Sequence, residues 1–98
     1  MKRYYSHYTY IHPDIFLKNS IVETDDECRI TRIFPFDREI ERTEFYSGLL
    51  LFLQEGIDLS EDMYGRIKDA DFISVGLDIS LNDHYSIIIH KEDFISGK

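Results

Sequence analysis

Five consecutive apolar residues, Leu49 to Leu53, lie at the centre of the 98-residue sequence, within the stretch EFYSGLLLFLQEG of residues 44–56. An uninterrupted run of this length is typical of a strand buried on both faces or of a short buried helix, and periodicity alone does not separate the two. We interpret residues 44–53 as a strand. A chain of this size has room for one core, so residues 1–98 are expected to form a single domain.

The clearest alternation in the sequence is FISVGLDISL, residues 72–81. Its odd-numbered residues are all apolar: Ile73, Val75, Leu77, Ile79 and Leu81. This pattern indicates a strand with one buried and one wet face. The residues that follow, Asn82 and Asp83, favour a turn, so residues 84–91 are expected to pair back on this strand.

Residues 20–34 predict a β-hairpin in which Ile21–Thr24 and Arg29–Phe34 flank an acidic turn. Ile30 and Ile33 are out of phase, which indicates a bulge near Arg32. Residues 3–11 favour a first strand covered on both faces, followed by a turn at residues 17–19. Regular alternation in that strand would place Tyr4, Tyr8 and Tyr10 on one face and Tyr5 and Ile11 on the other.

Residues 58–71 carry the helix signals of the chain. Ser60 is a candidate N-cap, acids follow it in the first turn, and Arg66 and Lys68 lie in the last. The fold expected from all these segments is mainly β (β-rich α+β). It is an antiparallel sandwich or rolled sheet of about six or seven strands with one short helix near residues 60–68.

The chain has 19 acidic and 11 basic residues, a net charge of −8. This balance repels phosphates, so nucleic acid is not an expected partner. No apolar run approaches the ~20 residues of a membrane helix, the first residues lack a signal-peptide pattern, and Cys28 is the single cysteine. We therefore expect a cytoplasmic protein of bacterial type, without an internal disulfide or a membrane partner.

Two stretches of the first half, KNSIVETDDECRI and FYSGLLL, resemble the N-terminal segment of amidohydrolase-superfamily enzymes of the chlorohydrolase and cytosine-deaminase-like kind. In that family an opening strand and a hairpin precede a strand that runs into a catalytic TIM barrel. The resemblance covers roughly residues 1–51. It implies that this chain is the small β domain of such an enzyme without the barrel.

The metal-binding residues of this family's catalytic centre are not found at the matching positions of this chain. With Gly48 aligned to the family's glycine, the two metal-binding histidines of the family fall on Asp58 and Ser60, and the sequence has no His-x-His pair. The chain is also too short for an eight-stranded barrel, which needs about 250 residues. The family hairpin has glycine where this chain has Cys28, so we expect either a positive φ at Cys28 or a different turn.

The chemistry-bearing residues give no recognised motif. The histidines, His7, His12, His84 and His90, lack the close spacing of metal ligands, although a composite site of histidines and acids from both chain ends is one alternative. The acidic clusters match no calcium loop and are interpreted as solvated charges. No nucleophile–base motif or phosphate-binding glycine loop occurs. We therefore expect no enzyme, and assign no catalytic residue, metal ligand or cofactor.

The candidate interaction surface is a set of N-terminal tyrosines: Tyr4, Tyr5, Tyr8 and Tyr10. Tyrosine is enriched where one end of a ring is dry and the other wet, as in protein interfaces. In the alternative interpretation these rings pack on Phe16, Phe34 and Phe45.

The leading hypothesis is a non-catalytic small β domain that acts by protein–protein association, as a homodimer or with another protein. One alternative is a metal- or small-ligand-binding protein or hydrolase that uses the composite histidine and acid site. Another is a truncated enzyme remnant without activity.

Overall fold

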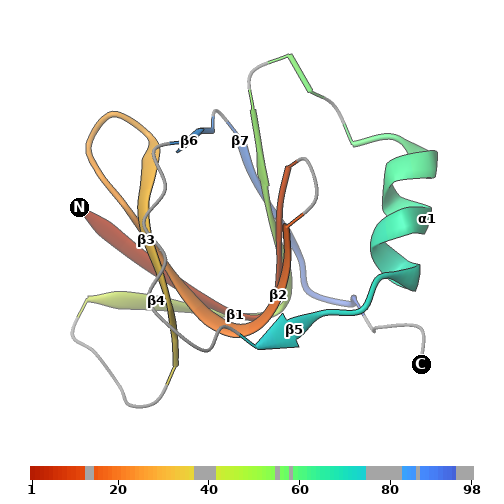
Figure 1. Cartoon of the computed structure of the whole chain (residues 1–98), viewed down its shortest axis with the longest axis horizontal. Coiled ribbons are helices and arrows are strands. Elements are labelled where there is room, and N and C mark those ends of the chain that lie inside the picture. Colours follow the sequence, from red (N-terminus) through yellow and green to blue (C-terminus); the bar gives the residue numbers. More distant parts are fainter. Residues whose placement is uncertain are drawn as a thin grey trace.

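A computed structural model describes residues 1–12, 15–36, 42–54, 56–57, 59–74, 83–85 and 87–94, arranged as Figure 1 shows. The strands are β1 (Lys2–Ile11), β2 (Ile15–Thr24), β3 (Arg29–Pro35), β4 (Thr43–Leu53), β5 (Ile73–Ser74), β6 (Asp83–His84) and β7 (Ile87–Lys91), and the helix is α1 (Glu61–Asp69). They confirm the predicted mainly β fold with a short helix.

The strands form one mixed sheet in the order β6-β3-β2-β1-β4-β7, and β5 pairs with β2 beside this path. The central strand β1 pairs antiparallel with β2 and parallel with β4. Figure 1 shows that the sheet is strongly curled, with α1 outside the curl. Of the two expected architectures, the rolled sheet is therefore the one found, and its pairing is mixed because β1 and β4 run in the same direction.

The apolar run of the sequence forms the second half of β4 and is buried on both faces, as predicted. Leu50 and Phe52 belong to a cluster inside the curl, the inner cluster: Tyr4, Ile11, Leu17, Val22, Ile30, Ile33, Leu50 and Phe52. Leu49, Leu51 and Leu53 belong to a second cluster under α1, the helix-side cluster: Tyr10, Leu49, Leu51, Leu53, Met63, Ile67, Phe72 and Phe94. This strand therefore links the two cores.

The sheet bends along a line that crosses its three central strands, β2, β1 and β4. In β1 this line passes through His7. On one side of β1, Asn19 in β2 has φ +52°, and on the other side Gly48 in β4 has φ +84°. The β1–β4 register also shifts between Ser6 and Tyr8, which marks a bulge. Positive-φ residues and bulges re-aim a strand, so these residues produce the curl.

Beyond the bend, the even-numbered side chains of β1 face the opposite side of the sheet from Tyr4. Tyr4 lies in the inner cluster before the bend, whereas Tyr10 lies in the helix-side cluster after it. Ser6 and Thr9, both buried, approach each other to 2.7 Å between their hydroxyl oxygens across the bend. The prediction that Tyr4, Tyr8 and Tyr10 share one face is therefore wrong, because regular alternation stops at His7.

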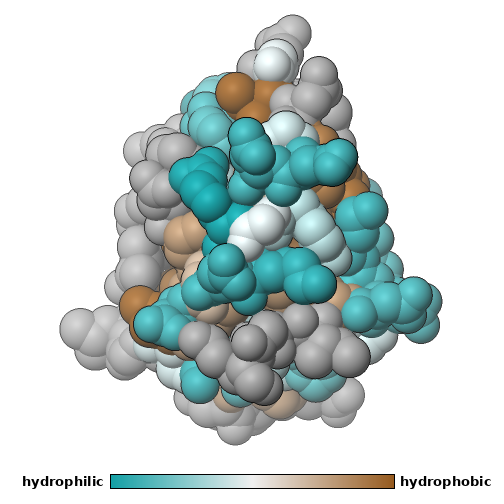
Figure 2. Space-filling view, turned by 90° about the vertical axis from the view of Figure 1, so that its right-hand side faces the viewer, coloured by the Kyte–Doolittle hydropathy of each residue, from teal (hydrophilic) through white to brown (hydrophobic). Residues whose placement is uncertain are grey.

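Helix α1 begins where the sequence predicts. The Met63 N–H donates to Ser60 Oγ at 3.1 Å, so Ser60 is the N-cap. Met63 and Ile67 are the buried side chains of the helix and pack against β4 in the helix-side cluster. Figure 2 shows hydrophilic residues over much of the side that carries α1. The helix is thus held by one narrow apolar stripe.

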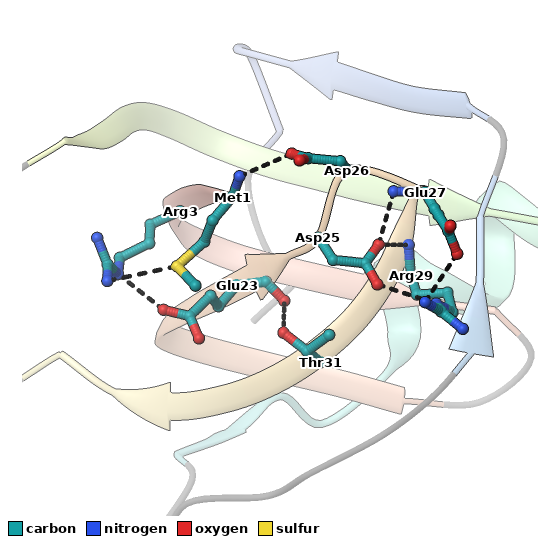
Figure 3. A network of polar contacts seen from close by, with 8 residues as sticks. All are labelled: Met1, Arg3, Glu23, Asp25, Asp26, Glu27, Arg29 and Thr31. Atoms are coloured by element: carbon teal, nitrogen blue, oxygen red, sulfur yellow. Dashed lines mark hydrogen bonds and ion pairs between the residues drawn. The ribbon is translucent and has the colours of Figure 1, made fainter.

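The hairpin between β2 and β3 turns at Asp25–Cys28 and is fastened by Asp25 (Figure 3). Its Oδ1 accepts the N–H groups of Glu27 at 2.8 Å and Arg29 at 3.0 Å, and its Oδ2 accepts Arg29 Nε at 2.9 Å. These contacts, led by the Arg29 N–H, lower the pKa of Asp25. The predicted bulge is also present, because Glu23 pairs with Arg32 and Thr24 with Ile30.

Cys28 has φ +63°, so the positive φ is found, one of the two outcomes expected at this position. A side chain with a Cβ is strained in this region, by about 1–2 kcal/mol. We therefore expect Cys28→Gly to raise the free energy of unfolding by about 1 kcal/mol in urea titrations. Cys28→Ala is the control, since it removes the thiol but keeps the Cβ, and it should change little. An equal gain in both variants would contradict the strain interpretation.

The predicted hairpin of residues 84–91 with residues 72–81 is not formed by the described residues. Where these segments are described, β5 pairs with β2, β6 with β3 and β7 with β4. Ile88 packs on the inner cluster and Ile89 on the helix-side cluster. A strand with apolar residues on both faces is best covered beside β4, the strand that separates the two clusters.

Two local predictions are wrong, and a third lies mostly outside the described residues. The expected turn at residues 17–19 lies inside β2, because Asn19 takes up the change of direction within the strand. Ile73 is 61 % exposed, since the neighbouring Phe72 takes the buried place in the helix-side cluster. The strand predicted at residues 72–81 is described only at Ile73–Ser74, and residues 75–82 lie outside the described part of the chain.

Candidate functional site

Two of the predicted interaction residues, Tyr4 and Tyr10, belong to the core. Tyr10 is 1 % exposed and packs on Phe16, with 5.1 Å between the ring centroids. Tyr4 is 7 % exposed and meets the Phe52 ring edge-on at 5.9 Å. Because β1 is covered on both faces, these two rings do not form an outer surface for a protein partner, which corrects their assignment.

Tyr8 is partly buried at the bend. Its ring lies 5.0 Å from that of Phe72 and 5.4 Å from that of Phe94. It also lines a cavity of about 200 Å³ together with residues of the bend and the chain beyond β7: His7, Lys18, Asn19, Gly48, Glu92 and Phe94. Most of the Tyr8 ring surface is therefore used in packing.

Tyr5 remains on the outer surface, where it forms an aromatic group with Phe36 and Phe45. We call Tyr5, Phe36 and Phe45 the outer aromatic cluster. Its ring centroids lie 4.8 Å (Tyr5–Phe36), 5.7 Å (Tyr5–Phe45) and 6.1 Å (Phe36–Phe45) apart. Phe45 is 49 % exposed and Phe36 is 36 % exposed. Neither phenylalanine belongs to the inner or the helix-side cluster.

The outer aromatic cluster is held in place by the β1–β4 ladder and by hydrogen bonds to Asn19 of β2. Tyr5 pairs with Phe45 across the parallel β1–β4 ladder, so backbone hydrogen bonding fixes the spacing of the two rings. The Tyr5 hydroxyl donates to Asn19 Oδ1 at 3.0 Å, and the Phe36 N–H donates to the Asn19 carbonyl at 3.1 Å. Burial raises the pKa of Tyr5, so its hydroxyl stays protonated at neutral pH.

The acid beside the cluster points away from it. Glu44 precedes Phe45 in β4, and successive side chains of a strand project to opposite faces. Its carboxylate accepts a 2.6 Å hydrogen bond from the Tyr46 hydroxyl. This hydrogen bond is the leading cause of the raised pKa of Tyr46. The outer aromatic cluster is therefore free of a carboxylate from this neighbour.

The histidines do not converge within the described residues. His7 lies at the bend of β1, His12 beyond its end, and His84 in β6 pairs with Arg29. His90 in β7 has its Nε2 2.6 Å from the Ser47 carbonyl oxygen and its ring 4.9 Å from that of Tyr46. Over the described part of the chain, no group of three or more His, Cys, Asp or Glu residues is placed to hold a metal ion.

Sequence reasoning missed Phe36 as a surface residue and treated Phe45 as a packing partner. Its alternative interpretation named Phe16, Phe34 and Phe45 together as packing partners of the tyrosines, and in the structure Tyr10 packs on Phe16 and Tyr5 on Phe45. The signal for exposure was the polarity around Phe45, which stands between Glu44 and Tyr46 before the apolar run begins. Among the described residues, no helix combines the length and apolar character needed to cross a bilayer.

Comparison of the chain with protein-family models, with curated proteins and with solved structures gave no match. The resemblance of the first half to amidohydrolases therefore stays a hypothesis.

Proposed function

We propose that this chain is a non-catalytic β domain that acts by protein–protein association, and that its outer aromatic cluster binds the same cluster of a second copy. The observation that carries the proposal is the exposure of Phe45 and Phe36 as a pre-packed group on the sheet. Aromatic side chains are enriched at interfaces, where burial of a large ring costs little conformational entropy.

The absence of charged side chains within the outer aromatic cluster suits contact between two copies of an acidic chain. Each copy has a net charge of −8, so two copies repel each other at most approaches. The outer aromatic cluster consists of uncharged side chains, and Glu44 turns to the other face. A two-fold symmetric contact brings the same patch together from both copies, which suits a cluster that is itself uncharged.

The resemblance to the small β domain of amidohydrolases forms part of this proposal. The positive φ at Cys28, where the family hairpin carries glycine, supports it. In such an enzyme the small domain stands beside a barrel. A domain without the barrel would present aromatic surface to another chain instead.

The test measures the oligomeric state by sedimentation equilibrium over a range of concentrations. We expect a monomer–dimer equilibrium for the unaltered chain and at least a tenfold weaker dimer, on the order of a typical interface anchor, for Phe45→Ser. Ile73→Ser is the matched control, because Ile73 is an exposed aliphatic residue outside the cluster. Higher salt should strengthen the dimer, since it screens the repulsion between like charges.

A monomer at every concentration would overturn the proposal. So would an Ile73→Ser variant that weakens the dimer as much as Phe45→Ser, because the contact would then lie elsewhere.

A further inference from the structure

At one open end of the curled sheet, which we call its mouth, the two edges of the sheet nearly meet. β6 and β7 lie at opposite ends of the strand order, yet only residues 85–86 separate them in sequence. The Tyr85 N–H donates to the Cys28 carbonyl oxygen at 3.0 Å, which ties this connection to the β2–β3 hairpin. The inner face of the curled sheet is therefore bounded by strands on both sides (Figure 1).

A cavity of about 420 Å³ lies at this mouth. It is lined by residues from the start of β1, the β2–β3 hairpin, the connection between β6 and β7, and β7: Lys2, Tyr4, Thr24, Asp25, Asp26, Cys28, Tyr85 and Ile88. We call it the mouth cavity. Its volume falls in the range of small-molecule sites, roughly 300–1,000 Å³, and the mouths of rolled β-sheets are a common place for such sites.

The two aromatic walls of the mouth cavity, Tyr4 and Tyr85, pack against the same ring. Phe52, which is buried, meets Tyr4 edge-on at 5.9 Å and Tyr85 edge-on at 5.3 Å. Burial, followed by the charges of Tyr85 and Glu44, raises the pKa of Tyr4 well above its ordinary value. The Tyr4 ring is therefore neutral at physiological pH, and Ile88 adds an apolar surface beside the two rings.

The charged residues that line the mouth cavity are two carboxylates, Asp25 and Asp26, and one cation, Lys2. Asp25 is engaged with Arg29, and Glu27 also pairs with Arg29, at 2.8 Å. Asp26 is 93 % exposed and its Oδ1 lies 2.9 Å from the N-terminal ammonium group (Figure 3). A pair this exposed is weak and exchangeable. Lys2 is the cation that lines the cavity among the described residues.

We propose that the mouth cavity binds a small organic cation, a substituted ammonium group carried on an apolar body. The ammonium group would lie against the faces of Tyr4 and Tyr85, and the Asp26 carboxylate would attract it from the rim. Aromatic rings attract cations through the negative potential of their faces, and this is the recurring way in which proteins bind quaternary ammonium groups. The net charge of −8 adds a long-range attraction for cations.

The test is a calorimetric and NMR titration of the whole chain with three aromatic probes of similar size. Benzyltrimethylammonium is the cation, benzyl alcohol the neutral probe and benzoate the anion. We expect saturable binding of the cation, about tenfold weaker binding of the neutral probe and no binding of benzoate. Chemical-shift changes should centre on Tyr4, Tyr85 and Ile88.

Matched variants separate the ring from the charge. Tyr85→Leu should weaken binding of the cation about tenfold, whereas Tyr85→Phe keeps the ring and should bind as the unaltered chain does. Asp26→Asn should weaken binding severalfold, and Lys2→Gln should strengthen it because it removes a like charge. Tyr64→Leu is the control, since Tyr64 lies on α1 away from this cavity.

Three results would overturn the proposal: no saturable binding of the cation, tighter binding of benzoate than of the cation, or unchanged binding in Tyr85→Leu. Benzoate binding would assign the cavity to an anion held by Lys2. The same titration on Phe45→Ser should give unchanged affinity, because the mouth cavity lies on the inner face. A failure of self-association and a failure of cation binding are thus separate results.

Discussion

Replacing Gly48 by alanine is expected to destabilise the fold by about 4 kcal/mol or more, enough to unfold a large share of a marginally stable domain. Gly48 has φ +84°, and a Cβ built on it would meet the carbonyl oxygens of Lys91 and Glu92, the second at 2.7 Å. These are backbone atoms at the end of β7, so they cannot turn aside as a side chain would. The clash is added to the strain of a positive φ.

Two other glycines are the controls for Gly48. Gly56 has a similar φ of +86°, but a Cβ added there would have no neighbouring atom within 4 Å, so Gly56→Ala should cost only about 1 kcal/mol. Gly65 lies exposed within α1, and Gly65→Ala should stabilise by up to about 1 kcal/mol. Urea unfolding followed by circular dichroism measures all three. If Gly48→Ala and Gly56→Ala lose equal stability, the close approach of β7 is not the cause.

Replacing Phe52 by alanine is expected to lower the free energy of unfolding by about 4 kcal/mol. Phe52 is 1 % exposed, and it supports the rings of both Tyr4 and Tyr85 in the inner core. Its loss removes a large buried apolar surface and leaves a cavity between those two rings. Urea unfolding at low protein concentration gives the change, so that self-association does not contribute.

Phe45→Ala is the matched control for Phe52→Ala, because both residues lie in β4 but Phe45 is 49 % exposed. It should change stability by no more than about 0.5 kcal/mol. A loss at Phe45 comparable to that at Phe52 would show that the outer aromatic cluster is part of the core rather than a surface for a partner.

Features that depend on a few neighbouring residues could be predicted from the sequence. Ser60 caps α1 because its hydroxyl needs only the N–H three residues on. The hairpin turn follows from the residues of the turn itself, whereas the positive φ at Cys28 was expected only from the family resemblance. The burial of Leu49–Leu53 on both faces follows from five apolar residues in one strand.

The candidate site could be predicted only in part. The N-terminal tyrosines look alike in sequence, yet Tyr5 lies on the outer surface while Tyr4 and Tyr10 lie in different cores. The core or surface that each ring joins depends on the bend at His7. This bend arises from Asn19 and Gly48 on the neighbouring strands. Phe36 joins Tyr5 only because β3 ends next to Asn19 in the folded sheet.

The sequence by itself determined the local elements of this protein: a mainly β chain, a capped helix, a hairpin turn and a strand with two apolar faces. The tertiary structure alone decided which strands pair, where the sheet curls and which aromatic rings stay outside. The physical reason is the separation in sequence between the residues that make each contact. Caps and turns are settled by contacts within a few residues, whereas β7 beside β4 and the Tyr5 ring beside Phe45 depend on the relative stability of pairings between distant segments.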